Sequence, residues 1–479
     1  SSKGIKRRND LNFAVKYMVA PDFSLIGKIM HGETFGLSGV LTLNPRNSPY
    51  KSGIETAPMP LLDDNIILQD QKSMDPDIFS RSENLLELDG INLLTLRIVK
   101  KDTLEVEIED RNYLDVAQMV GRATRILSKT IPVQVQVFKL KLIDFQSSFK
   151  VTEVVIMRNA IRENELAFDG PEKLWSAVTF KNPSPTISKD QGFVGKKTIW
   201  SIYPDIDIML FDPHFPINGS IGWEAKLNYR LNSSLAINSS IKQPIITALD
   251  DIKRGPKEGL PNVRSDYMYY YRDIGTKPYL ANLTIDQYFK PFKTIYSQLN
   301  LGYFEMMYAG VRSETVWKDT NKPYGLGLDL AIVKKRNTYG DFSLIDSNYT
   351  TIIGSFYYDL SSDWNFKLDA GKYLAGDYGG TLSLLRTFNN GWEIGAYATI
   401  TDVEFSTYGE GSFEKGITLK APLSWFTGKK SKAYRQTIIK PISGDGGARL
   451  YLENDKFLYE RIKIYGKKSF KDNWKRFYR

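Results

Sequence analysis

Histidine and cysteine, the residues used most often for metal binding and covalent catalysis, are nearly absent from this chain. There are 2 His, at positions 31 and 214, and no Cys. A His/Cys metal cluster and a Cys nucleophile are therefore excluded. Asp212 could orient the imidazole of His214, but Pro213 and Pro216 flank this histidine, so a turn is the favoured interpretation.

Paired carboxylates are the next groups that could do chemistry. Asp63-Asp64 and Asp250-Asp251 lie in loop-like sequence, where acids are normally solvated and acid–base catalysis would need shifted pKa values. The run Gly444-Asp445-Gly446-Gly447 could form an anion-binding nest, although a bulge or tight turn is favoured. There is no Walker loop and no Gly-x-Gly-x-x-Gly after a strand. We expect no catalytic residue, no cofactor and no metal, and hence no enzyme.

A set of charged residues and one tyrosine recurs at alternate positions of long β-like segments. In the register we assign, these side chains project into a common interior. Two interpretations remain open. Mixed charge and aromatic rings could line a path for a sugar polymer, or the charges could pair with one another and plug the interior. The candidates are Arg312, Glu314, Asp329, Lys367, Asp369, Glu393, Tyr397 and Lys420.

The elements that would position these residues are strands with a period of two. Within residues 364–402, Leu368 and Ala370 alternate with Lys367 and Asp369, and short Gly-rich or Asn-Gly turns join three strands. The same alternation recurs in 326–332 and in 417–424. One face is bulky and apolar, and the other carries charge, hydroxyl groups and glycine. A soluble sandwich could not use the polar face as its dry centre, whereas a closed barrel with lipid outside and water inside fits it.

The composition agrees with a β-rich membrane protein. Aromatic residues make up 13% of the 479 residues, led by 28 Tyr, and a barrel places such rings at both membrane interfaces, although a Tyr-rich soluble β protein would have the same count. No run of about 18 apolar residues occurs, so we expect no helical span. The opening SSKGIKRRND has no apolar core, so we expect that a secretory signal was removed or never included. The absence of Cys is compatible with an oxidising periplasm.

Turn-rich segments divide the chain into six expected parts. The C-terminal part should contain about 12–16 antiparallel strands, among them 219–231, 264–273 and 413–425, and many are long enough for a tilted membrane span. The parts are a segment of three strands that reads as the end of something larger (1–45), a linker (46–89), a soluble α+β module (90–170), a second linker (171–200), a C-terminal transmembrane β-barrel (201–453) and a basic aromatic tail (454–479).

The α+β module is predicted from a change of period. A strand at 103–109 precedes a helix at 112–129, with Asp110 or Asn112 as its N-cap, and Pro132 stops the helix. Two more strands and a short helical stretch follow, which gives the order βαββα.

The tail carries the densest part of the formal net charge of +9. Its basic residues stand beside Phe470, Trp474, Phe477 and Tyr478, a combination that could contact nucleic acid, lipid phosphates or an anionic polymer. A solvated terminal tail is the favoured interpretation, and we expect no nucleic-acid partner.

Several blocks of this sequence resemble the YjbH family of outer-membrane exopolysaccharide proteins, which includes the related capsule protein GfcD. The blocks span about residues 112–450. They are GRATRIL at 121–127, LFDPHFPI at 210–217, LPNVRSDYMYYY at 260–271, GYFEMMYAG at 302–310, GKYLAGDYGGTLSLLRTFNNGWEIGAYATITD at 371–402, GEGSFEKGI at 409–417 and GDGGARL at 444–450.

The resemblance implies a Gram-negative outer-membrane β-barrel that takes part in making or exporting an exopolysaccharide or capsule, with no catalytic residues to carry over. Its expected partners are outer-membrane lipid, polysaccharide and secretion components of the periplasm or outer membrane. Members are expected to carry two barrels and periplasmic soluble segments, so the resemblance implies that residues 1–45 are the last strands of a truncated first β-barrel and that the α+β module at 90–170 is periplasmic. Two alternatives stay open: a barrel enzyme that modifies lipid or glycan through acids such as Asp369 and Glu393, and a plugged structural scaffold.

Overall fold

The structure is a computed structural model in which the chain forms two units, residues 1–53 and residues 54–479. The following residues are described: 9–20, 23–32, 34–42, 57–61, 77–110, 112–185, 198–210, 217–249, 261–361, 363–404, 414–428, 430–440, 445–452 and 457–479.

The first unit is a three-stranded antiparallel meander. It consists of β1 (Phe13–Ala20), β2 (Phe23–Met30) and β3 (Thr34–Leu41), in the order β1-β2-β3. His31 and Gly32 form the second turn with φ values of 55° and 72°, a left-handed conformation typical of tight turns. The three strands lie within the segment 1–45, which was expected to consist of strands.

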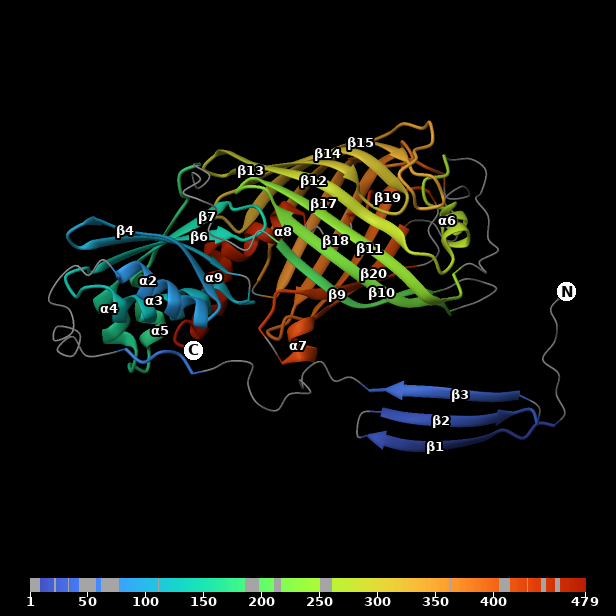
Figure 1. The fold of residues 1–479 in the computed structure, drawn as a ribbon, viewed down its shortest axis with the longest axis horizontal. Helices are drawn as coiled ribbons and strands as arrows, with labels where there is room; N and C mark the ends of the chain where they lie inside the picture. The colour runs from blue at the N-terminus through green and yellow to red at the C-terminus, as the bar shows by residue number, and fades with distance from the viewer. Residues whose placement is uncertain are drawn as a thin grey trace. The chain divides into compact units, whose positions relative to one another are not determined.

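The second unit is dominated by one antiparallel sheet of 13 strands, in which each strand pairs with its sequence neighbours. Figure 1 shows this sheet curling round on itself. The strands are β9 (Thr198–Leu210), β10 (Ile217–Arg230), β11 (Leu235–Thr247), β12 (Tyr279–Phe292), β13 (Ile295–Tyr303), β14 (Tyr308–Lys318), β15 (Tyr324–Lys335), β16 (Tyr349–Asp359), β17 (Trp364–Lys372), β18 (Tyr378–Thr387), β19 (Glu393–Thr401), β20 (Glu414–Pro422) and β21 (Tyr434–Ile439).

The alternation expected from the sequence is present in the accessibility of the side chains. Along β15, Leu326, Leu328 and Ile332 are 52%, 45% and 62% exposed, whereas Ala331 and Val333 are 3% and 1% exposed. Period-two geometry sends successive side chains to opposite faces. The outer face of this sheet is therefore apolar, and the inner face is buried.

The first and last strands of the sheet are joined by side chains. Arg435 of β21 donates to the carboxylate of Asp205 and to the Ile206 carbonyl oxygen of β9, the latter at 3.2 Å. Among the described residues no backbone ladder connects β9 to β21. Each antiparallel pairing between neighbouring strands reverses the strand direction. The number of reversals from β9 to β21 is even, so these two edge strands run in the same direction. In place of the predicted closed barrel, the structure has a curled sheet whose two edge strands are connected by the Arg435 side chain.

One strand prediction was wrong, and two strand boundaries differ from those expected. Residues 264–273 do not form a strand, because α6 (Tyr267–Ile274) forms a helix in which the Tyr267 and Tyr271 rings meet one turn apart at 6.0 Å. Strand β9 begins at Thr198, inside the expected linker, and its Pro204 is tolerated because β9 is an edge strand. The strand expected at 413–425 ends at Pro422, where the short helix α7 (Leu423–Thr427) begins.

The α+β module is larger than the sequence indicated. It consists of α2 (Ile78–Leu88), β4 (Ile91–Lys100), β5 (Thr103–Asp110), α3 (Val116–Thr130), β6 (Val137–Asp144), β7 (Lys150–Met157), α4 (Arg158–Asn164), α5 (Gly170–Ala177) and β8 (Thr179–Lys181). Its sheet has the order β4-β5-β6-β7-β8. Helices α2 and α5 thus lie within the two expected linkers. The N-cap of α3 is Asp115, whose Oδ1 accepts from Ala117 N at 2.9 Å, and not Asp110 or Asn112.

The C-terminal tail is folded, which corrects the expectation that it is solvated. Helices α8 (Leu458–Ile462) and α9 (Lys467–Asn473) are joined by η1 (Lys463–Tyr465), and η2 (Trp474–Arg476) follows. Trp474 and Phe477 are 4% and 0% exposed, and the Trp474 indole donates to the Pro171 carbonyl oxygen at 2.7 Å. These rings belong to one hydrophobic core that also contains residues of the module and of the sheet.

No helix among the described residues is long and apolar enough to cross a membrane.

The close approach of α3 to the tail predicts that adding one methyl group at Gly121 would disturb the packing of the tail. A Cβ placed on Gly121 would lie 1.7 Å from the Phe477 carbonyl oxygen, so Gly121→Ala should displace the tail and cost about 1–3 kcal/mol. We expect faster trypsin cleavage within 463–479, measured by mass spectrometry. Gly354→Ala is the control, since the nearest atom to its added Cβ is 3.7 Å away. Equal protection of the tail in both variants would contradict this packing.

Candidate functional site

The first cluster of inner-face charges lies on β14 and β15. Glu314 and Asp329 are opposite one another in the β14–β15 ladder, and the guanidinium of Arg312 bridges them. Its Nε lies 2.9 Å from Asp329 Oδ2, and one terminal nitrogen lies 2.9 Å from Glu314 Oε2. Charge-assisted bonds of this kind are stronger than neutral ones. They also fix the position of the Arg312 guanidinium.

The second cluster lies on β16 and β17. Asp369 Oδ1 lies 3.2 Å from Lys367 Nζ and accepts from the Ser355 hydroxyl at 2.5 Å. Its Oδ2 lies 2.8 Å from Arg449, which comes from the segment 445–452. This carboxylate therefore has two cationic partners and a hydroxyl donor.

The remaining candidates lie on β19 and β20. Glu393 and Lys420 are opposite one another in that ladder and form an ion pair of 2.7 Å. Tyr397 donates to Glu414 Oε1 at 3.2 Å, and Lys440 Nζ lies 3.4 Å from the same oxygen. The two acids of the enzyme hypothesis, Asp369 and Glu393, thus belong to separate ion-paired clusters.

All of the sequence-selected residues lie on the inner face, but the structure does not bring them into one site. Each charged candidate is paired with an opposite charge. An unpaired buried charge is costly, and pairing with further hydrogen bonds offsets the desolvation penalty. Of the two interpretations left open for these residues, mutual pairing is the arrangement present in this structure.

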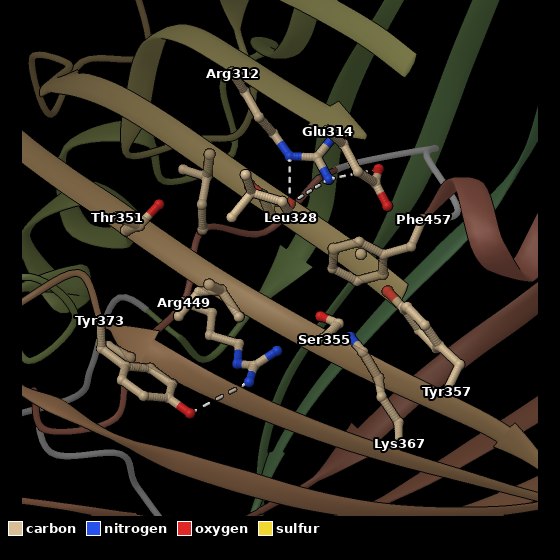
Figure 2. A pocket seen from close by; sticks show the side chains of 15 residues that line it. Arg312, Glu314, Leu328, Thr351, Ser355, Tyr357, Lys367, Tyr373, Arg449 and Phe457 are labelled. Carbon is tan, nitrogen blue, oxygen red and sulfur yellow. Dashed lines mark hydrogen bonds and ion pairs between the residues drawn. The ribbon is translucent and has the colours of Figure 1, made fainter. Parts of the chain in front are cut away.

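A cavity lies between the first and second clusters (Figure 2). Arg312, Lys367 and Arg449 are among the residues that line it. Phe457 closes one side, with its ring centroid 4.3 Å from Lys367 Nζ and 5.4 Å from the Arg312 guanidinium carbon. The cavity thus presents three cations, two of which pack against an aromatic ring supplied by the tail.

Helix α8, the first helix of the tail, packs against the inner face of the sheet. The Tyr459 ring stacks on the Tyr357 ring of β16 with centroids 4.0 Å apart and planes 8° apart. Tyr459 also donates to Asp359 Oδ2 at 3.3 Å, and Leu458 N donates to Glu314 Oε1 at 3.1 Å. Helix α8 therefore occupies part of the interior.

The module closes the same end of the sheet. The Phe149 ring meets Tyr288 and Tyr296 of the sheet edge-on at 5.9 Å and 5.3 Å. Arg230 of β10 forms a buried ion pair of 3.1 Å with Glu109 of the module. Aromatic and ionic contacts thus hold the module over the sheet opening that α8 enters (Figure 1).

Arg461 links all three parts. Its guanidinium lies 2.7 Å from Asp144 Oδ2 of the module, and its carbon lies 5.2 Å from the Tyr288 ring of β12. Burial raises the pKa of Asp144, but Arg461 and hydrogen bonds from Ser147 outweigh it, so the pKa lies below its ordinary value.

The glycine-rich run near Asp445 anchors a loop. The Oδ1 of Asp445 accepts from the backbone N–H groups of Val263, Arg264 and Ser265 at 2.8, 2.7 and 2.9 Å. Gly447 has a φ of 68°, as a tight turn requires. The favoured turn interpretation is thus confirmed for 445–447, and the carboxylate of Asp445 is itself the anion held by backbone N–H groups. Asp63-Asp64, Asp250-Asp251 and His214 lie outside the described residues.

Several interior residues were missed by sequence reasoning. Arg449, Phe457 and Tyr459 belong to a segment without strand periodicity, so no alternation could assign them to the inner face. Tyr357 follows the period of β16 and could have been found from it. In the part of the chain that the structure describes, no group of three or more His, Asp or Glu side chains is placed to hold a metal ion.

Comparison with known proteins gives a family, a sequence relative and a solved structure with a weak similarity. The YjbH family model, described as "Exopolysaccharide biosynthesis protein YbjH", matches residues 1–463. The "Uncharacterized lipoprotein YjbH" of Escherichia coli (strain K12) is 25% identical over 368 residues, which cover 73% of this chain and 51% of that protein. This chain thus spans about half the length of that relative. Among solved structures, "OmpT (in-vitro folded), an outer membrane protein of Vibrio cholerae" matches with a TM-score of 0.23 and 10% identity over 47% of this chain and 81% of that one.

The Asp144–Arg461 pair predicts a loss of stability in acid. Because folding lowers the pKa of Asp144, its contribution is complete above the ordinary carboxyl pKa of about 3.9 and is lost as the pH falls through the lowered value. Asp144→Asn should cost about 3 kcal/mol at neutral pH and flatten the pH dependence below about pH 4. Urea titrations followed by tryptophan fluorescence measure both effects.

The matched control is Glu105→Gln, which removes a module carboxylate from the more exposed pair with Lys141 at 3.1 Å. Its cost should stay below about 1 kcal/mol. Equal losses in the two variants would show that the Asp144 contact has no special role.

Proposed function

This chain belongs to the YjbH family of exopolysaccharide biosynthesis proteins, and on that premise we propose that it is an outer-membrane β-barrel protein that takes part in the assembly or secretion of an exopolysaccharide or capsule. The proposal covers a chain that spans about half of its curated relative. The module would lie in the periplasm, where it could contact the components that deliver polymer.

The observation that carries the proposal is the inverted distribution of side chains across the sheet. Leucine and isoleucine occupy the outer face of β15, while Arg312, Glu314 and Asp369 are 1–2% exposed on the inner face. A water-soluble sheet places its apolar face inside, whereas a membrane barrel places it against lipid. Membership of the family supports a role with a polysaccharide, and the inverted distribution of side chains supports a location in a membrane.

Because the interior is filled at one end, a conduit for polymer would have to be gated. Helix α8 and the module fill one end of the curled sheet, so a polymer could pass only after they move. A fixed plug, and therefore a structural scaffold of a secretion system, is the second candidate. The stacked Tyr459 and Tyr357 rings support both forms, and electrical conductance separates them.

Conductance in planar bilayers tests whether the interior can open. Tyr459→Ala removes the stacked ring and the hydrogen bond to Asp359, a truncation that costs about 3–5 kcal/mol for a buried aromatic side chain. We expect more frequent or larger openings in this variant than in the wild-type protein. Tyr358→Ala is the control, because Tyr358 lies on the outer face. Silent bilayers for every variant would favour the scaffold.

Removal of the protein from its host tests the role in secretion. We expect that deleting its coding sequence abolishes surface polysaccharide and leaves intracellular polymer synthesis intact, because export and not polymerisation would be lost. Complementation with the wild-type protein should restore the surface polymer. Unchanged surface polymer in the deletion strain would overturn the proposed function.

A further inference from the structure

A second cavity lies along the inner face on β10 to β13. Its most frequent lining residue is asparagine, which four successive strands contribute as Asn228, Asn238, Asn282 and Asn300. We call this space the asparagine cavity. Each carboxamide offers two donors and one acceptor oxygen without carrying charge.

The carboxamides of the asparagine cavity are held in place by a chain of hydrogen bonds. Asn228 Nδ2 donates to Asn238 Oδ1 at 2.6 Å, and Asn238 in turn donates to the carboxylate of Asp286. Asn300 donates to the other oxygen of Asp286 at 2.7 Å and accepts from Arg312 at 3.1 Å. A site whose polar groups are fixed in advance loses less entropy when it binds a ligand.

The charge of the asparagine cavity differs from that of the cavity between the charged clusters. Arg312, Lys367 and Arg449 line the latter, whereas no basic side chain lines the asparagine cavity among the described residues. Its single carboxylate, Asp286, accepts from Asn238, Asn300 and Thr284. An anionic ligand would thus meet the Asp286 carboxylate, with Arg312 and Arg461 only behind the lining residues Asn300 and Tyr288, while a hydroxyl-bearing ligand would meet uncharged amides.

The cavity carries aromatic rings as well as amides. Tyr288 and Phe304 supply rings. Apolar surface with a few fixed polar groups is the usual composition of a small-molecule site. Gln146 of the module also lines the cavity, so it adjoins the junction between the module and the sheet.

From these features we infer that the asparagine cavity is a binding site for an uncharged glycosyl unit. The ring hydroxyl groups would bond to the carboxamides, and the C–H face of the sugar would pack on Phe304. The inference rests on the proposed function and names its substrate class: the neutral sugars of the polymer are bound here, and anionic substituents are disfavoured by Asp286.

Calorimetry with the full chain in a detergent without a sugar headgroup tests this site, since maltoside and glucoside detergents would compete. The probes are lactose and cellobiose, with glucuronic acid as the charged comparison. We expect a neutral disaccharide to bind with a Kd of about 1 mM or tighter and glucuronic acid to bind at least tenfold more weakly. Asn282→Leu, which keeps the number of side-chain heavy atoms but removes the amide donors and acceptor, should weaken disaccharide binding at least tenfold, and Thr284→Val should weaken it severalfold without a change in fold.

Asn365→Leu is the matched control, because Asn365 follows the inner-face period of Lys367 and Asp369 on β17 and lines neither cavity. Circular dichroism checks that each variant folds. No binding of either disaccharide to the wild-type protein, equal weakening by Asn365→Leu, or tighter binding of glucuronic acid would each overturn the inference. These outcomes are distinct from failure of the proposed function, which would appear as surface polymer that persists when the coding sequence is deleted.

Discussion

The pairing of charges on the inner face of the 13-stranded sheet is the constraint on which the rest of the structure depends. Because alternate residues of every strand point outward and are often large and apolar, the intervening charged residues have no route to solvent except the interior. Arg312, Lys367 and Lys420 each meet a carboxylate there. Removing one partner would leave a buried charge uncompensated. The ion-paired clusters are therefore what permits a sheet with this inversion to fold, and they also give the interior its polar chemistry.

A single hydrophobic core then connects the sheet, the module and the tail. Tyr288, Tyr296 and Tyr357 from the sheet share this core with Phe138 and Phe149 from the module and with Tyr459 and Phe477 from the tail. Arg461 adds an ionic contact at the same junction. The parts are thus coupled, so movement of the tail would change both the opening of the interior and the position of the module. A gated conduit and a fixed scaffold differ only in the free energy needed to break this junction.

Much of the sheet could be predicted from the sequence, because its period of two is a local property. Leu326, Leu328, Leu330 and Ile332 are on the outer face as expected, and the inner-face residues followed from them. The strand predicted at residues 264–273 was wrong because tyrosine-rich sequence favours strands. A helix forms there instead because Tyr270 and Ile274 pack against the sheet. The prediction of a solvated tail was wrong for a related reason. Because the tail is rich in basic residues, its sequence does not indicate that Phe470, Trp474 and Phe477 are buried. These rings pack against α3, α5 and β8, more than 280 positions earlier in the chain.

The sequence lacks cysteine, so single cysteines can be introduced for spin labelling without a background, and this allows the most direct test of the proposed orientation of the sheet. Labels at each position from 326 to 332 of β15 would be measured in lipid bilayers for collision with oxygen, which concentrates in lipid, and with a water-soluble nickel complex. The account predicts that oxygen accessibility peaks at 326, 328, 330 and 332 and is low between them. Equal accessibility to the nickel complex at all seven positions, in a protein that stays dispersed without detergent, would contradict it.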